Sequence, residues 1–160
     1  MYIYQYDQII FGYGDGTTWN YEDTEEILKT DQWNHVAITF NNASNTLKVY
    51  ANGQFLEELT GGGEVFTTAL RYINDNQELR AHIDEFRVWK EERSLADLTG
   101  NMNKALKGNA EKLALYYSFD QVTNGEIEDK TGLNDGNLLN GPGIQNSNAL
   151  LTPVIEENKV

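Results

Sequence analysis

The segment Asn74-Asp75-Asn76-Gln77-Glu78 places oxygen-bearing side chains at successive positions. Calcium is held in proteins by several carboxylate, amide and carbonyl oxygens, so this segment has the composition of a cation-binding loop. Asp84 follows in a strand-like alternation that puts it on one face with Phe86 and Val88. That face is expected to point to the core, where an unpaired carboxylate is costly. We therefore predict these calcium ligands: Asn74, Asp75, Asn76, Glu78 and Asp84. The alternative is a polar turn in which backbone amides or an arginine satisfy Asp84.

Aromatic residues of the N-terminal part offer a second kind of site. A sugar site needs a flat apolar face for the ring and a few fixed polar groups. Trp19, Tyr13, Tyr21 and Trp33 supply such faces, and Trp19 lies near the tip of a predicted hairpin. The predicted ligand-binding residues are Trp19, Tyr21 and Asp15. Packing in the core or at a sheet edge is the alternative for each aromatic residue.

Catalytic patterns are weak. A retaining glycosidase on a β-sandwich needs two carboxylates about 5–5.5 Å apart. Glu126 and Glu128 form the one same-face glutamate pair, in a weak strand flanked by turns. His82 and Asp84 stand two apart with no nucleophile beside them, and the common serine-hydrolase, zinc-protease and phosphate-loop motifs are absent from the sequence. We therefore expect a protein that is not an enzyme, with a glycoside hydrolase as a remote alternative.

Composition fits one globular domain and limits its partners. The chain has 160 residues, Lys+Arg 12 against Asp+Glu 25, a net charge of −13 and no cysteine. A negative surface repels nucleic-acid phosphates and anionic lipid, and it suits divalent cations, basic partners or neutral glycans, unless it serves solubility alone. No apolar run reaches the ~18 residues of a membrane span. Residues 1–20 lack the layout of a signal peptide.

Short alternating segments predict strands along most of the chain. Residues 9–13 and 17–21 flank a Gly-Asp-Gly turn, and Asn52-Gly53 is a strong signal for a tight hairpin. Residues 33–40 alternate so that Val36, Ile38 and Phe40 share the core face. Ser94-Leu95-Ala96-Asp97 is a capping box that begins the one predicted helix, about residues 94–106. The pattern predicts an all-β protein, an antiparallel β-sandwich with one short helix.

The order and spacing of these segments resemble a known family. The segments are residues 32–40 with 47–53, residues 83–89 leading into the helix, and residues 115–120 with 129–132 and 134–136. Together they resemble the laminin-G-like, concanavalin A-like and pentraxin-related domains of bacterial surface and secreted proteins. The family's usual opening, a Phe-Asp-Gly segment and a Trp-bearing strand, does not precede Tyr2.

The resemblance implies a two-sheet jelly roll, a non-catalytic binding role, an extracellular or cell-surface setting, and often a bound Ca²⁺. Pentraxin-like relatives hold cations in the loop before the strand at residues 83–89, which agrees with the predicted calcium site. We expect one domain over residues 1–145, in which Tyr116–Gly136 is the closing segment, and a tail over residues 146–160 without obligatory structure. The predicted function is recognition of a glycan or an extracellular protein, assisted by calcium. A structural spacer or adhesion repeat without its own ligand is the alternative.

Overall fold

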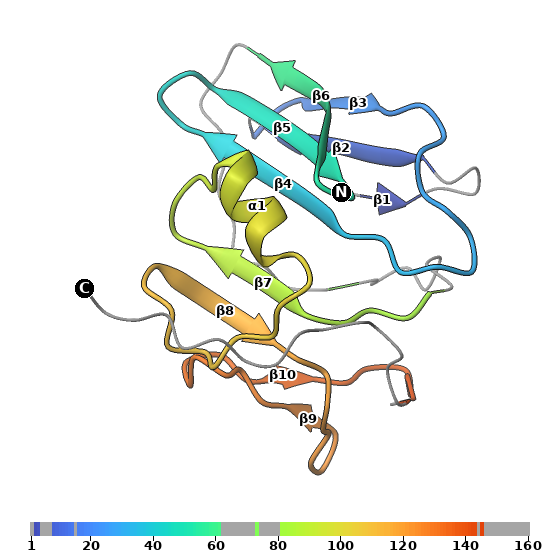
Figure 1. Ribbon diagram of the computed structural model, residues 1–160, viewed down its shortest axis with the longest axis vertical. Coiled ribbons are helices and arrows are strands. Elements are labelled where there is room, and N and C mark those ends of the chain that lie inside the picture. The colour runs from blue at the N-terminus through green and yellow to red at the C-terminus, as the bar shows by residue number, and fades with distance from the viewer. Residues whose placement is uncertain are drawn as a thin grey trace. The chain divides into compact units, whose positions relative to one another are not determined.

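The computed structural model describes residues 2–3, 8–14, 16–61, 73, 81–143 and 145, with the backbone alone for residues 2–3. Its elements are β1 (Tyr2–Ile3), β2 (Ile9–Gly14), β3 (Trp19–Asp23), β4 (Val36–Asn41), β5 (Thr46–Ala51), β6 (Gln54–Thr60), β7 (Phe86–Trp89), α1 (Leu95–Asn101), β8 (Leu113–Tyr117), β9 (Glu126–Ile127) and β10 (Gly136–Asn137). All strand pairings among the described residues are antiparallel, and α1 is the single α-helix there (Figure 1). The predicted all-β class is confirmed.

The chain forms two compact units. The first unit comprises Met1–Ala81 with Ser94–Met102, and the second comprises His82–Arg93 with Asn103–Val160. A single sandwich over residues 1–145 stays a prediction, as does the closing role of Tyr116–Gly136. The predicted tail, residues 146–160, lies outside the described residues.

The first unit is built from two three-stranded sheets, β1-β2-β3 and β4-β5-β6. Residues 9, 11 and 13 of β2 and residues 47, 49 and 51 of β5 form one apolar cluster between these sheets. Ile9, Phe11 and Val49 are each 0% exposed. Burial of such side chains contributes about 1.5–3 kcal/mol apiece, so this apolar layer stabilises the pairing of the two sheets. The partly buried Val36, Ile38 and Phe40 pack against the cluster, which confirms the predicted core face of β4.

The β5–β6 hairpin turns at Asn52-Gly53 as predicted. Both residues have positive φ, 50° and 77°, which a type I′ turn requires. The Asn52 side chain also fixes the approach to β4, because it accepts a hydrogen bond from the His35 amide at 3.0 Å and donates one to Asn34 Oδ1 at 3.0 Å. The strand begins only at Val36. Trp33 and His35 therefore lie in the preceding loop, and the prediction that the strand already begins at residue 33 was wrong.

Helix α1 begins as predicted and ends early. Ser94 caps it, and the reciprocal Ser94–Asp97 bonds of a capping box are both present. The helix ends at Asn101 instead of near residue 106. Thr99, Gly100 and Asn101 are all weak helix formers, which favours termination there. Thr99 and Met102 stand over Gly53, so α1 packs against the β5–β6 turn, where any side chain at Gly53 would meet it.

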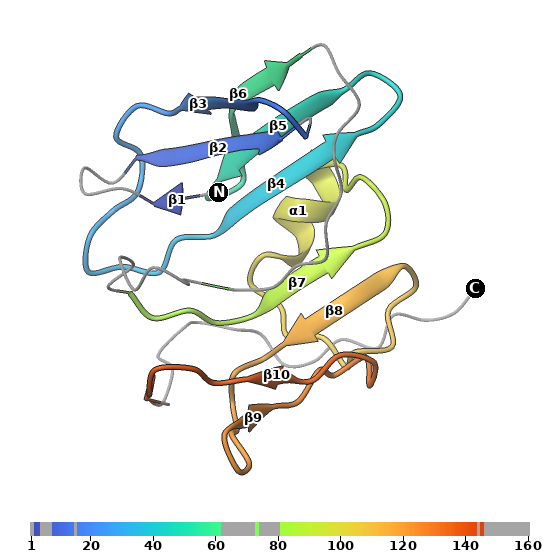
Figure 2. The ribbon, with the colours of Figure 1, turned by 180° about the vertical axis from the view of Figure 1, so that it is seen from behind.

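The second unit pairs β7 with β8 and β9 with β10; β9 and β10 lie side by side in both views (Figures 1 and 2). Its buried cluster consists of Leu106, Leu113 and Tyr116, with Trp89 and Ala110 packed against them. Val88 is 36% exposed. The sequence predicted that Val88 points to the core together with Asp84 and Phe86, and this prediction was wrong for Val88. Arg87 and Trp89 share the strand face that packs on Tyr116, and the register of β7 against β8 shifts between Val88 and Trp89.

Candidate functional site

Trp19 and Tyr21 form the most open aromatic pair on a strand of the first unit. They lie two residues apart on β3, hence on the same face, and are 49% and 60% exposed. Asn20 between them points to the opposite face. The other aromatic candidates differ: Tyr13 is 5% exposed and belongs to the core, and Trp33 lies in a loop. Asp15 lies outside the described residues.

Glycines lie opposite both aromatic residues. Gly14 pairs with Trp19 and Gly12 pairs with Tyr21 across the β2–β3 ladder. A Cβ atom on Gly14 would stand 3.6 Å from Cε3 of Trp19, so the indole lies beside a position that has no side chain. We name Trp19, Tyr21, Gly12 and Gly14 the aromatic shelf. The two positions of β2 opposite the aromatic residues carry no side chains. Side chains from those positions therefore do not cover the rings of Trp19 and Tyr21.

Gly12 is also needed for the strands to meet. A Cβ atom there would lie 2.2 Å from the carbonyl oxygen of Asn20 and 2.9 Å from Cα of Tyr21. These obstacles are backbone atoms of the paired strand and cannot rotate aside. The sequence does not reveal the role of either glycine, because that role depends on the register between β2 and β3. The available signal was their alternation with the core residues Phe11 and Tyr13.

An acidic run begins at the end of the same strand and continues beyond it. Glu22, Asp23, Glu25 and Glu26 are all exposed, and we name them the acidic rim. The buried Thr24 in their midst fixes the run to the sheet. Its hydroxyl accepts a hydrogen bond from the Ile9 amide at 3.0 Å, and its own amide donates to the Ile9 carbonyl at 3.1 Å. The rim therefore starts at a defined place, directly beyond Tyr21.

Of the five predicted calcium ligands, Asp84 lies in the part of the chain that the structure describes. Asn74, Asp75, Asn76 and Glu78 lie outside the described residues. Asp84 is half-buried, and its Oδ1 accepts a hydrogen bond from the Glu85 amide at 2.9 Å. Within the part of the chain that the structure describes, no group of at least three His, Asp or Glu side chains is arranged to hold a metal ion.

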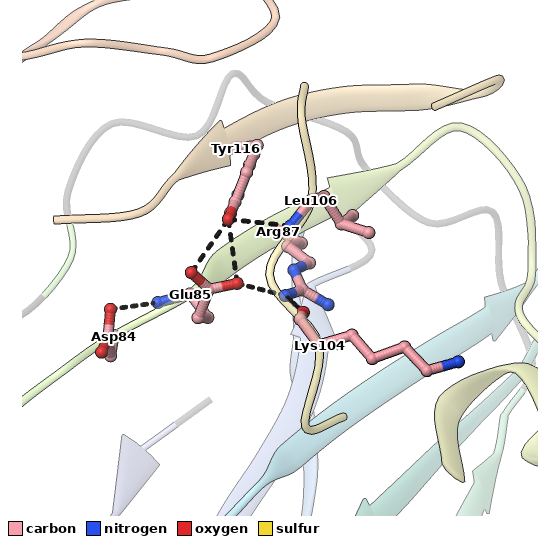
Figure 3. Close-up of polar contacts among 6 residues, drawn as sticks. All are labelled: Asp84, Glu85, Arg87, Lys104, Leu106 and Tyr116. Carbon is pink, nitrogen blue, oxygen red and sulfur yellow. Dashed lines mark hydrogen bonds and ion pairs between the residues drawn. The ribbon is translucent and has the colours of Figure 1, made fainter. Parts of the chain in front are cut away.

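Glu85, and not Asp84, is the carboxylate at the centre of a polar network (Figure 3). Its oxygens each lie 2.9 Å from the Tyr116 hydroxyl, which donates to them. The Arg87 guanidinium pairs with the same carboxylate, donates to the Lys104 carbonyl, and lies over the Tyr116 ring at 5.4 Å from its centroid. The Tyr116 hydroxyl accepts a hydrogen bond from the Leu106 amide at 3.2 Å. The network ties β7, β8 and the segment after α1 together.

The backbone explains why the alternation failed here. Glu85 has φ of 56°, a conformation that is uncommon for any residue with a side chain. The regular strand therefore starts at Phe86, and the side chains before it no longer follow the period of two. A left-handed glutamate has no sequence signature, so the carboxylate that needs partners could not be assigned from the pattern.

Protonation in this network follows burial. Burial raises the pKa of Glu85 above its ordinary range, although the hydrogen bond and charge of Arg87 act in the opposite direction. Burial raises the pKa of Tyr116 to about 12, helped by the neighbouring Glu85 charge and opposed by the Leu106 amide. Tyr116 therefore stays protonated at neutral pH and keeps its role as the donor to Glu85. Each member is engaged with another member, which suits a structural role.

The glutamate pair considered for catalysis lies on the surface. Glu126 and Glu128 are both exposed and flank the buried Ile127. Glu128 forms an ion pair with Lys130 at 2.6 Å. The nearby Asp129 is the fully buried carboxylate of this segment, and it accepts hydrogen bonds from Tyr116, Thr131 and Asn134. Sequence analysis did not single out Asp129, since a buried aspartate in a Gly-containing turn looks like any exposed one.

The comparisons with known proteins bear on this geometry. The profile of the Concanavalin A-like lectin/glucanases superfamily matches residues 1–99, which include the shelf and β1 to β7. The chain belongs to this superfamily. The predicted resemblance to the concanavalin A-like fold is thereby confirmed. The superfamily match ends at residue 99, whereas the sequence pattern suggested similarity as far as about residue 140.

One solved relative of this concanavalin A-like chain is a crystal structure of a proposed carbohydrate-binding protein from Bacteroides ovatus. The two share 25% sequence identity and superpose with a TM-score of 0.65. The similarity covers 83% of this chain and 41% of that protein, so the chain spans about two fifths of its relative's length. No curated protein matches the chain.

Proposed function

We propose that this chain is a non-catalytic recognition module that binds glycan chains on the aromatic shelf. The observation that carries the proposal is the exposure of Trp19 and Tyr21 on one strand face, opposite Gly14 and Gly12. Large exposed aromatic side chains without cover are a known mark of binding surfaces. The carbohydrate-binding assignment proposed for the relative from Bacteroides ovatus supports the same class of ligand.

The shelf has the features that sugar recognition requires. The C–H faces of a pyranose ring are apolar and stack on an aromatic ring, while its hydroxyls need polar partners. Trp19 and Tyr21 provide the flat faces, and the Tyr21 hydroxyl and the Asp23 carboxylate provide polar atoms on the same strand face. Residues i and i+2 of a strand are about 6.6–6.8 Å apart, which suits two consecutive sugar units better than a single one.

Alanine substitutions in the shelf should abolish most of the binding. A glycan array should give at least one ligand for the unaltered chain, and Trp19→Ala should weaken its affinity by about 10- to 100-fold, the range of an aromatic hot spot. Tyr21→Ala should weaken it less. Titration calorimetry measures both changes.

Phe55→Ala is the matched control, because Phe55 is also an aromatic residue with a similar exposure, 48%, but lies on β6 in the other sheet. It should leave the affinity unchanged. The proposal is wrong if the array shows no glycan ligand, or if Phe55→Ala weakens binding as much as Trp19→Ala.

We also propose that a bound calcium ion stabilises the module through the ligands that the sequence predicts. An ion that binds only the folded chain adds RT ln(1 + [L]/Kd) to the free energy of unfolding, about 2.7 kcal/mol at a hundred times Kd.

Calcium chloride should therefore raise the melting temperature relative to EGTA, and Asp84→Asn and Asp75→Asn should each reduce that shift. Glu128→Gln, a surface carboxylate, should not change it. An equal melting temperature in calcium and in EGTA would remove calcium from the proposal and leave the shelf unaffected. The extracellular setting expected from the sequence stays a prediction. Among the described residues, the structure contains no helix that is long and apolar enough to cross a membrane.

A further inference from the structure

We propose that the aromatic shelf selects uncharged glycan chains and rejects chains that carry carboxylate or sulfate groups. This inference rests on the proposed function, because it concerns which glycans the shelf accepts. It is derived from the charges that stand around Trp19 and Tyr21. The sequence alone suggested neutral glycans as one of several partners for an acidic chain, and the structure attaches that preference to one strand.

Asp23 occupies the next position of the shelf face. Alternation along β3 puts Trp19, Tyr21 and Asp23 on the same side, and Asp23 is exposed. Its pairing with Ile10 places it at the end of the β2–β3 ladder, next in line after Tyr21. A glycan chain that stacks on both rings and continues along the strand therefore reaches a carboxylate.

No positive charge is near in sequence to compensate the acidic rim. Residues 1–28 contain no Lys, Arg or His, and the first cation after β3 is Lys29. Within the described strands of this unit, the single Lys or Arg is Lys48 on β5, in the opposite sheet. Recognition of an anionic sugar normally uses arginine or lysine as the partner. The charged side chain on the shelf face, Asp23, is negative and does not match an anionic sugar.

The rim favours hydroxyl groups for a second reason. An ionised carboxylate accepts hydrogen bonds and donates none, so Asp23 matches a sugar hydroxyl and is mismatched to a uronic acid carboxylate or a sulfate. Like charges across a binding surface are repelled, and the repulsion between exposed groups is screened beyond about 8 Å at physiological ionic strength. The rejection of acidic chains should therefore weaken as salt is added.

The test compares sugars that differ only in the acid group. The probe pairs are cellohexaose with its C6-oxidised uronic acid form, and mannohexaose with hexameric mannuronate. Whichever neutral member binds, its acidic partner should bind at least about tenfold more weakly at about 20 mM NaCl, and the gap should narrow at about 500 mM. Titration calorimetry of the full chain gives the affinities.

Two double variants separate the rim from general surface charge. Glu22→Gln with Asp23→Asn removes the shelf-face charge of Asp23 together with the charge of Glu22 on the other face, and Glu57→Gln with Glu58→Gln removes the same charge from exposed positions on β6. The first variant should reduce the ratio between the affinities for the neutral and the acidic sugar by about threefold or more. The second variant should leave this ratio unchanged.

The outcomes distinguish this inference from the proposed function. If both members of a pair bind equally and Trp19→Ala abolishes both, the shelf binds glycans but the selection for uncharged chains is wrong. An acidic member that binds more tightly, or a gap that the Glu57/Glu58 variant narrows as much as the rim variant, also overturns it. If no member of either pair binds and the glycan array is blank, the proposed function and the selection fail together. A ligand found on the array outside these pairs is then compared with its own oxidised or sulfated form, with the same criteria.

Discussion

Replacing Asp129 with asparagine is expected to lower the free energy of unfolding by about 2–4 kcal/mol, a large share of the stability of a domain. Asp129 is 0% exposed and uses both carboxylate oxygens. Oδ1 accepts hydrogen bonds from the amides of Tyr116 at 2.9 Å and Thr131 at 3.0 Å. Oδ2 accepts from the Thr131 hydroxyl at 2.7 Å and the Asn134 amide at 3.1 Å.

Asparagine has nearly the same shape but turns one acceptor into a donor. Its NH₂ group would face either the two amides at Oδ1 or the hydroxyl and amide at Oδ2, so buried donors would point at one another. The bonds concerned connect β8 with the turn at residues 129–134, and that turn precedes β10. Loss of the carboxylate should therefore release the β9–β10 segment from β8.

Urea unfolding measures the change, and Glu128→Gln is the control. Glu128 neighbours Asp129 but is exposed and holds only the surface ion pair with Lys130, so its substitution should change stability by less than about 0.5 kcal/mol. Equal effects of the two substitutions would show that the buried hydrogen bonds of Asp129 contribute nothing beyond its charge.

Acid titration gives an independent readout of the same residue. Burial acts to raise the pKa of Asp129, but the hydrogen bonds from Thr131, Tyr116 and Asn134 outweigh it, and the pKa lies below its ordinary value of 3.8. The unfolded chain then binds this proton at a higher pH than the folded chain. Asp129 therefore stabilises the fold above about pH 4, and this contribution is lost as the pH falls through the lower, folded-state pKa. The Asp129→Asn variant should lack that component of acid destabilisation.

Segments with strong local signals were predictable from sequence. The strands β4, β5 and β6 follow from the alternation of Val36, Ile38 and Phe40 and from the Asn52-Gly53 turn, since both signals act between residues close in the chain. The capping box at Ser94 is local for the same reason. These segments hold their shape through contacts that a sequence pattern can express.

Features that depend on one backbone angle or on distant partners were not predictable. The positive φ of Glu85 separates Asp84 from the alternation of β7, and the strand packs Trp89 instead of Val88 on the core of its unit. Nothing in the residue type announces such an angle. Asp129 is important only because the chain folds back to bring the Tyr116 amide to it, across a separation of 13 residues.

The aromatic residues of the candidate site could be predicted from sequence, but the glycines opposite them could not. Trp19 and Tyr21 could be assigned to a hairpin strand by alternation, and the exposure expected of Trp19 follows from its place near the turn. The glycines opposite them could not be assigned, because their pairing requires the register between β2 and β3. Gly12 and Gly14 look equivalent in sequence, and only the distances around them separate a position that must be glycine from one that need not be.

Gly12→Ala should therefore destabilise the first unit and weaken glycan binding, whereas Gly14→Ala should do neither. The added methyl group at Gly12 would lie 2.2 Å from the Asn20 carbonyl oxygen, and that oxygen belongs to a paired strand. Relief requires β3 to move away from β2, at a cost of about 1–3 kcal/mol for overpacking. The movement displaces both Trp19 and Tyr21, so affinity should fall by about tenfold in parallel.

Gly14 gives the matched comparison on the same face of the same strand. A methyl group there would meet the Trp19 ring at 3.6 Å, which is ordinary van der Waals contact, and alanine removes conformational freedom from the unfolded chain. Stability and affinity of Gly14→Ala should stay within measurement error or rise slightly. Thermal unfolding and calorimetry of the two variants decide the matter. If both are tolerated, β3 can shift without loss, and the rigid placement of Trp19 and Tyr21 over a glycine-bearing strand is not what the binding face requires.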